Sequence, residues 1–239
     1  RAYERWLKDG HTVAEAREKL WPETVEYSFY MAVKNHYKGK SWTEWDEDIR
    51  LQKREAMEQL QYELADEAGF YAFLQMKFEE QWSALKSYAN EKGIRIIGDI
   101  PIYVALDSAD TWYHPELFQF DENRMPVAVA GCPPDGFSAT GQLWGNPLYQ
   151  WEYHGKTGYQ WWMRRMEYSF RMYDVVRVDH FRGFEAYYSI PYGNKTAVDG
   201  TWMPGPGMEL FHTIEEKLGK LRFPIRLSNA EDIEKLRNE

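Results

Sequence analysis

The spacing of apolar side chains predicts that the first part of the chain is helical. The stretch TVEYSFYMAVKNHY at 24–37 has a helical period, and a longer helical pattern runs from about Leu51 to Lys92. Within the longer pattern, apolar residues recur every three or four positions and so share one face: Phe70, Leu74, Phe78, Trp82, Leu85 and Ala89. We expect this face of the helix to be buried by packing against other parts of the protein. Asn90 and Gly93 are typical of a helix end.

The middle of the chain has the pattern of buried strands separated by a helix. GIRIIGDIPIYVALDS at 93–108 is a short apolar run, which predicts a buried strand with Asp99 near its carboxyl end. TGYQWWMRRMEYSFRMY at 157–173 predicts a helix, and DVVRVDHF at 174–181 predicts a second buried strand. A helix followed by a buried strand, twice over, indicates a parallel α/β fold, in which functional groups lie at the carboxyl ends of the strands.

The segment between the two predicted strands carries few regular signals. Residues 105–150 are rich in Gly, Pro, Asp and Asn, and this composition predicts a long loop. A loop of such length inside a folded domain is usually either functional or disordered. The aromatic rings spaced through and just beyond it, at Phe137, Trp144, Tyr149 and Trp151, argue against disorder.

Composition places the chain among globular proteins and narrows its partners. Of 239 residues, 44% are hydrophobic and 28% are charged. The net charge of −9 disfavours a nucleic-acid partner, which would call for basic stripes, and favours a neutral substrate. Aromatic residues make up 17% of the chain. These rings either fill the core or stack on sugar faces, so carbohydrate is a candidate ligand.

Several signals bear on location and cofactors. The single cysteine, Cys132, cannot form an internal disulfide, which fits a reducing compartment and predicts a cytoplasmic location. No run approaches the ~20 apolar residues of a membrane span, and RAYERWLKDG at the start contains no signal core. The six histidines lack an HExxH spacing, and no Walker loop or GxGxxG occurs, so we expect no metal and no cofactor. Because no initiator Met is present, we expect the chain to begin within a longer protein.

The second predicted strand ends in an unusual concentration of charge. Side chains alternate across a strand, so Arg177 and Asp179 are expected on one face. A guanidinium beside a carboxylate stabilises its ionised form, which is the form that a nucleophile or an oxocarbenium stabiliser requires. The alternative is a structural ion pair, which needs no role in chemistry. Spacing alone leaves both interpretations open.

Three longer stretches resemble a known family. IIGDIPIYVALDSADTW, PPDGFSATGQLWGNPLY and VVRVDHFRGFEAYYSIP together resemble the 4-α-glucanotransferases called amylomaltases or disproportionating enzymes (glycoside hydrolase family 77), of the α-amylase superfamily. The resemblance runs from about Glu26 to Gly219 and consists of several long motifs in the family's order. It identifies the chain as a central fragment, because the family's first strands and a later His-Asp-Asn segment are not found in it.

The resemblance implies an α/β protein with a (β/α)8 TIM-barrel glycosidase fold and helical insertions, of which only part is present. Residues 1–92 would form a mainly helical insertion or subdomain and a barrel helix. Residues 93–239 would form the partial barrel, with an aromatic substrate loop at 131–151. The implied reaction moves an α-1,4-glucan segment from a donor to the 4-hydroxyl of an acceptor, through a covalent glucosyl-enzyme and with retention. The implied partners are maltodextrin donors and acceptors.

The family's motifs also imply roles for individual residues. Asp179 would be the nucleophile, Arg177 would hold it ionised and oriented, and Asp99 would support the substrate site near the barrel rim. The remaining implied substrate-binding residues are Phe137, in a loop that covers the donor sites, with Gln142, Trp144 and His180. Gly136 stands where many relatives carry a tyrosine, so this chain lacks that ring.

The second carboxylate is predicted less directly. The family's acid/base lies in an Ala-Glu-Asp-Leu-Gly motif at the end of an apolar strand, whereas this chain reads FPIRLSNAEDIEKLRNE. Glu231 is therefore either the acid/base or an ordinary glutamate of a helix that Asn229 caps.

Three functions remain open from the sequence. The first is the 4-α-glucanotransferase. The second is a truncated, catalytically incompetent fragment that binds maltodextrin, and the third is an α-glucan hydrolase.

Overall fold

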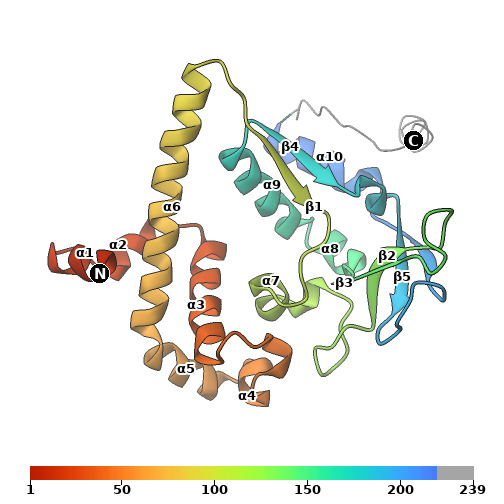
Figure 1. Ribbon diagram of the computed structural model, residues 1–239, viewed down its shortest axis with the longest axis horizontal. Helices are drawn as coiled ribbons and strands as arrows, with labels where there is room; N and C mark the ends of the chain where they lie inside the picture. The colour runs from red at the N-terminus through yellow and green to blue at the C-terminus, as the bar shows by residue number, and fades with distance from the viewer. Residues whose placement is uncertain (220–239) are drawn as a thin grey trace. The chain divides into compact units, whose positions relative to one another are not determined.

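The computed structural model describes residues 1–219, which divide into two units (Figure 1). The first unit contains Arg1–Tyr88 and Asp107–Tyr113. The second contains Ala89–Leu106 and the described residues from His114 onward. Within this described part, no helix has both the length and the apolar character needed to cross a membrane.

The first unit is built from helices, which we call the helical unit. Its elements are α1 (Ala2–Lys8), α2 (Val13–Glu18), α3 (Pro22–His36), a 3-10 turn η1 (Trp42–Glu44), α4 (Glu47–Arg50), α5 (Arg54–Glu63), most of α6 (Ala65–Glu91) and α7 (Ala109–Tyr113). The helix predicted at 24–37 is confirmed as α3. A capping box begins α2, because the Thr12 hydroxyl accepts from the Glu15 N–H at 3.2 Å and the Glu15 carboxylate accepts from the Thr12 N–H at 3.1 Å.

The prediction of which α6 face packs is wrong in the described part of the chain. The larger apolar side chains of the predicted face are exposed: Phe70 by 37%, Leu74 by 41%, Phe78 by 45% and Leu85 by 54%. The buried side is made of small residues together with Phe73 and Met76. A Cβ on Gly69 would lie 2.6 Å from a Val13 methyl and 2.7 Å from the Tyr3 hydroxyl. Close approach of neighbouring segments, which needs small side chains, therefore decides the buried face.

Asp107 joins α7 to the rest of the helical unit. Its carboxylate accepts from the Tyr30 hydroxyl at 2.6 Å and the Trp42 N–H at 3.3 Å, and it forms an ion pair with Lys34. Burial raises the pKa of this carboxyl, but the hydrogen bonds from Lys34, Tyr30 and Trp42 outweigh it and lower the pKa below its usual value. The Asp107 carboxylate is thus stabilised in its charged form by contacts with three donor groups.

The second unit contains two sheets, and we call it the strand unit. A parallel pair is formed by β1 (Ile97–Pro101) and β4 (Val175–Asp179), which run side by side in Figure 1. An antiparallel sheet has the order β3-β2-β5-β6, from β2 (Ala128–Cys132), β3 (Gln142–Pro147), β5 (Ala186–Pro191) and β6 (Thr201–Pro204). The remaining elements are η2 (Pro115–Leu117), α8 (Trp151–Lys156), α9 (Gln160–Met172), η3 (Phe181–Phe184) and α10 (Met208–Leu218).

The two strands predicted at 93–108 and 174–181 are present and run parallel, but the prediction that they are buried is wrong. The two predicted strands pair in parallel, and α9 precedes the second of them. They are not buried on both sides, because Ile97 is 65% exposed and the side chains of Arg177 and Asp179 are 50% and 61% exposed. The predicted long loop at 105–150 contains β2 and β3.

Gly131, one of the loop signals in residues 105–150, has a structural role in the antiparallel sheet. A Cβ at this position would overlap the main-chain carbonyl of Gln142 on the neighbouring strand. Glycine is therefore the residue that allows the two backbones to pair here. The same glycine counts as a loop signal in a sequence pattern.

The main core of the strand unit packs α8, α9 and α10 with the antiparallel sheet. Its wholly buried members include Trp162, Leu148, Leu210 and Ile214. His154 is also 0% exposed, and its Nε2 lies 3.1 Å from the Leu117 carbonyl oxygen. Burial lowers the pKa of this imidazole to about 4. A neutral histidine is therefore part of the core at neutral pH.

Two helical glycines are expected to respond oppositely to alanine. Gly69→Ala places a methyl against Val13 and Tyr3, and overpacking of about 1–3 kcal/mol outweighs a helix-propensity gain of about 1 kcal/mol. For Gly155→Ala the nearest atom lies at 3.6 Å, so the propensity gain remains and the variant is stabilised. Urea unfolding of both variants measures the difference. A shift of equal sign in the two variants contradicts the packing described for α6.

The core histidine is expected to make stability depend on pH. The unfolded His154 titrates near pH 6.5 and the folded one near 4, so its contribution is complete above pH 6.5 and is lost as the pH falls toward 4. The loss amounts to about 3 kcal/mol. His154→Gln should flatten this part of the stability curve, whereas the exposed His212→Gln should leave it unchanged. Unfolding free energies at pH 7, 5.5 and 4.5 test this, and equal slopes in the two variants contradict it.

Candidate active site

The parallel pair of strands brings three charged side chains together. In the register of β1 and β4, Asp99 lies beside Arg177, and Pro101 lies beside Asp179. The Arg177 guanidinium contacts the Asp99 carboxylate through Nη1 and the Asp179 Oδ1 through Nη2, the latter at 3.0 Å. The prediction that Arg177 and Asp179 share a face is confirmed. We call Asp99, Arg177 and Asp179 the charged row.

The start of β4 is fixed by Asp174. Its Oδ2 accepts from the Ile96 N–H and from the Asn90 side-chain amide, each at 2.8 Å. Asn90 also donates to the Ile94 carbonyl at 3.0 Å. The residues that end α6 thus hold the beginning of both strands, and they set the register that aligns the charged row.

Both ion pairs of the charged row are open to solvent. The side chains of the row are 50%, 54% and 61% exposed, so solvent weakens their attraction and the pairs contribute little to folding stability. One cation thus lies between two exposed carboxylates. The small contribution to folding favours the interpretation of the row as a ligand site.

His180 follows the row and is held in an unusual conformation. Its φ of 54° lies in the left-handed region, which non-glycine residues seldom adopt. Burial lowers the pKa of its imidazole, with Arg182 adding to the effect and Asp179 opposing it. Its Nε2 is buried and has no hydrogen-bond partner within residues 1–219. Burial thus favours the neutral imidazole at this position.

Trp144 lies against His180. The two rings meet edge to face with centroids 4.8 Å apart, and the Trp144 side chain is 37% exposed. The Trp144 indole N–H donates to the Gln142 side-chain oxygen at 3.0 Å, which fixes Gln142 beside it. Gln142 and Trp144, predicted on a loop, lie instead on β3. The structure therefore brings together three of the predicted substrate-binding residues.

Two residues of this cluster were missed by the sequence analysis. The Tyr103 ring lies 6.3 Å from the rings of both Trp144 and His180, and burial raises the pKa of its phenol. The Asn146 amide donates to the Val104 carbonyl at 2.8 Å, which ties β3 to the segment after β1. The signal that could have identified Tyr103 is its position, two residues beyond the end of β1.

Phe137 is not brought into the cluster. Its side chain is fully exposed, and none of the described aromatic rings contacts it. The Asp135 Oδ1 accepts from the N–H groups of Phe137 and Ser138, each at 2.8 Å, so the turn that carries the ring is itself defined. Glu231, the predicted acid/base, lies outside the described residues.

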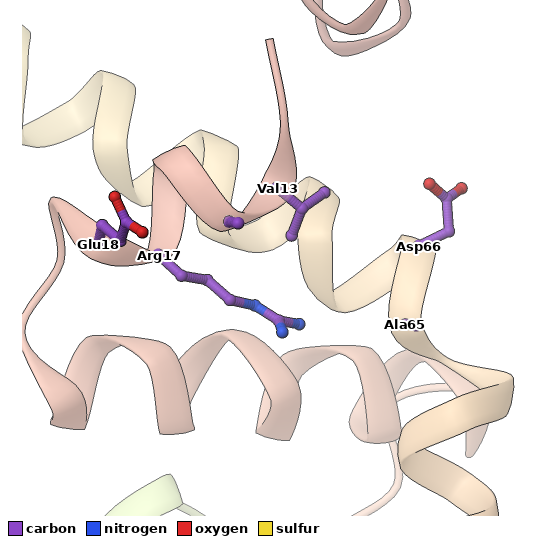
Figure 2. A pocket seen from close by; sticks show the side chains of 6 residues that line it. Val13, Arg17, Glu18, Ala65 and Asp66 are labelled. Atoms are coloured by element: carbon purple, nitrogen blue, oxygen red, sulfur yellow. The ribbon is translucent and has the colours of Figure 1, made fainter.

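A separate hollow of about 580 Å³ lies on the helical unit between α2 and the start of α6. Figure 2 shows Val13 and Glu18 on α2, Asp66 on α6, and the Arg17 side chain extending along the hollow. None of its lining residues belongs to the predicted site, whose described members all lie in the strand unit.

Comparison with known proteins identifies the family. The model of the 4-alpha-glucanotransferase family Glyco_hydro_77 matches residues 14–234, which is most of the chain. The chain is 50% identical over 205 residues to the 4-alpha-glucanotransferase of Clostridium butyricum, covering 85% of this chain and 42% of that protein. It is 47% identical over 205 residues to that of Thermus thermophilus, covering 86% of this chain and 41% of that protein.

Solved structures agree with this assignment. The amylomaltase from Streptococcus agalactiae in complex with acarbose matches with a TM-score of 0.84 and 44% identity, over 90% of this chain and 44% of that one. A Corynebacterium glutamicum amylomaltase, at 19% identity and a TM-score of 0.68, shares the fold. The chain is therefore a member of the 4-alpha-glucanotransferase family, as its motifs indicated. It spans less than half the length of the curated relatives described above.

Removal of the row's cation is expected to have little effect on folding. Because both of its ion pairs are exposed, Arg177→Met should change the free energy of unfolding by less than about 1 kcal/mol. Urea unfolding at low and high salt measures this change. A loss of several kcal/mol would show that the pairs are a structural brace after all.

Proposed function

We propose that the protein is a 4-α-glucanotransferase that transfers α-1,4-glucan segments between maltodextrins with retention. The observation that carries the proposal is the charged row, which a member of this family presents beside Trp144 and His180. Family membership and the amylomaltase crystallised with acarbose support an α-glucan substrate. The same proposal includes a (β/α)8 barrel, to which residues 93–239 contribute one part and residues 1–92 contribute a helical subdomain and one helix. It also includes a cytoplasmic location.

Asp179 is the nucleophile in this proposal. Its carboxylate attacks the anomeric carbon, while an acid protonates the oxygen of the departing glucan as that bond breaks. The acceptor's 4-hydroxyl then attacks the same carbon, gives its proton to the base and releases Asp179. Arg177 orients the carboxylate through the 3.0 Å hydrogen bond. Asp99, on the other side of Arg177, fixes the guanidinium in place.

The neighbouring residues hold sugar. The exposed Trp144 ring offers an apolar surface to a glucosyl unit, and Gln142 orients that ring. His180 is proposed as a substrate-binding residue that also holds the Trp144 ring in place through their edge-to-face contact. Phe137, on its exposed turn, closes over bound donor and limits the access of water, so that a sugar hydroxyl is preferred as acceptor. Glu231 is proposed as the acid/base that completes the pair of carboxyl groups.

Transfer is expected to depend on Asp179 in a simple product assay. With maltotriose, the wild-type chain should produce glucose and a ladder of longer oligosaccharides. Asp179→Asn should lower transfer by at least about 10³-fold, because an amide cannot form the glycosyl-enzyme. The exposed Asp199→Asn is the matched control and should retain activity. Retained transfer in Asp179→Asn removes this residue from the nucleophile role.

The same assay separates the two competing functions. Release of maltose and glucose without longer products indicates hydrolysis. Saturable maltodextrin binding without turnover indicates a binding fragment, which the exposed Trp144 ring favours as the second candidate. Glu231→Gln should be as severe as Asp179→Asn where Glu231 is the acid/base, and near-normal turnover would assign it to the surface instead.

A further inference from the structure

The end of β1 is held by side chains outside the charged row. Arg165, on α9, donates through Nη1 to the Ile102 carbonyl at 2.9 Å and through Nη2 to the Pro101 carbonyl at 2.5 Å. Its guanidinium lies over the Trp162 ring at 4.9 Å and the Trp161 ring at 5.4 Å, which fixes the plane of the fork. Two successive carbonyls are thus bound by one rigid, charged group.

A second donor reaches one of these carbonyls. The Tyr149 hydroxyl donates to the Ile102 carbonyl at 2.7 Å, and Arg165 Nη1 lies 3.3 Å from that hydroxyl oxygen. Because Tyr149 is only 1% exposed, water has little access to replace its hydroxyl as the donor to this carbonyl. Both lone pairs of the Ile102 oxygen are therefore used.

Ile102 also contacts the backbone of the proposed nucleophile. Pro101 lies beside Asp179 in the register. The Ile102 N–H, one residue further along the chain, bonds to the Asp179 carbonyl at 3.2 Å. The last backbone connection between β1 and Asp179 therefore depends on the peptide unit that Arg165 and Tyr149 hold.

We propose that Arg165 is a positioning residue for the charged row. By binding the Pro101 and Ile102 carbonyls it fixes the end of β1, and through the Ile102 N–H it fixes the main chain of Asp179. This inference rests on the proposed function for its effect on rate, because a nucleophile displaced by about 1 Å loses about 10²-fold in rate. Lysine cannot replace the fork, since an ammonium group is a single point donor.

Hydrogen exchange tests the inference without reference to activity. In Arg165→Met the Ile102 amide, measured by NMR, should exchange at least about 10-fold faster than in the wild-type chain. Met166→Ala, which weakens the packing of the same helix, is the control for general destabilisation, and its effect should be spread over the amides of the strand unit. An Ile102 amide that exchanges at the wild-type rate in Arg165→Met overturns the inference.

Kinetics test the consequence for the reaction. Arg165→Met should lower kcat for transfer by about 10- to 100-fold with KM changed by less than about 3-fold, because positioning acts on the transition state. Arg165→Lys should fold as the wild type does and still lose most of kcat. In the double variant Arg165→Met/Tyr149→Phe, the loss of kcat should be smaller than the combined losses of the two single variants, because both residues bind the same carbonyl.

The outcomes separate this inference from the proposed function. A wild-type chain that performs transfer, with Asp179→Asn inactive and Arg165→Met fully active, overturns the role of Arg165 and leaves the proposed function standing. A wild-type chain without transfer refutes the proposed function, and the exchange of the Ile102 amide then decides the inference alone. An Arg165→Lys variant with wild-type kcat also overturns it, because charge without the fork would then suffice.

Discussion

The site depends on the parallel register of two short strands. When β1 and β4 pair with Asp99 opposite Arg177, one guanidinium reaches a carboxylate on each strand. A shift of one residue would place Asp99 on the face opposite to Arg177 and Asp179 and so separate the charges of the two strands. The register in turn depends on Asp174 and Asn90 at the beginning of the strands and on the Ile102 peptide unit at their end. Hydrogen bonds at the two ends of the strand pair, more than the exposed ion pairs, therefore place the charges.

The surroundings of the row divide into an aromatic part and a solvent-exposed part. On one side, Trp144, His180 and Tyr103 form a contiguous aromatic cluster joined to β3 and to the segment after β1. On the other, the strand faces that carry the charges are open to solvent. Aromatic rings thus lie next to the charged end of β4, through the contact of Trp144 with His180.

Local patterns predicted what depends on neighbouring residues in sequence. The helix at 24–37 and the shared face of Arg177 and Asp179 follow from side-chain periodicity, and the parallel strands follow from the order of helices and apolar runs; all are present. The strands β2 and β3 were missed because residues 105–150 are rich in Gly, Pro, Asp and Asn. One of these residues, Gly131, is needed for close pairing with Gln142 but has the same appearance in a sequence as a loop glycine.

The remaining errors concern contacts between distant segments. The packing face of α6 was misassigned because approach of Val13 and Tyr3 to Gly69 is a tertiary property. Tyr103 was overlooked because its place in the cluster depends on β3, which begins at Gln142, far along the chain. Periodicity shows which side chains of an element are apolar. It does not show which distant segment packs against that element, or how closely.

The path of the chain through Asp107–Tyr113 has a consequence for synthesis. These seven residues belong to the helical unit, although the segments before and after them belong to the strand unit. They include Trp112, which is wholly buried, and Asp107, which accepts from Tyr30 and Trp42. On the ribosome, the helical unit therefore cannot complete its core when Tyr88 emerges, and it must wait until the first strand of the other unit has also left the exit tunnel.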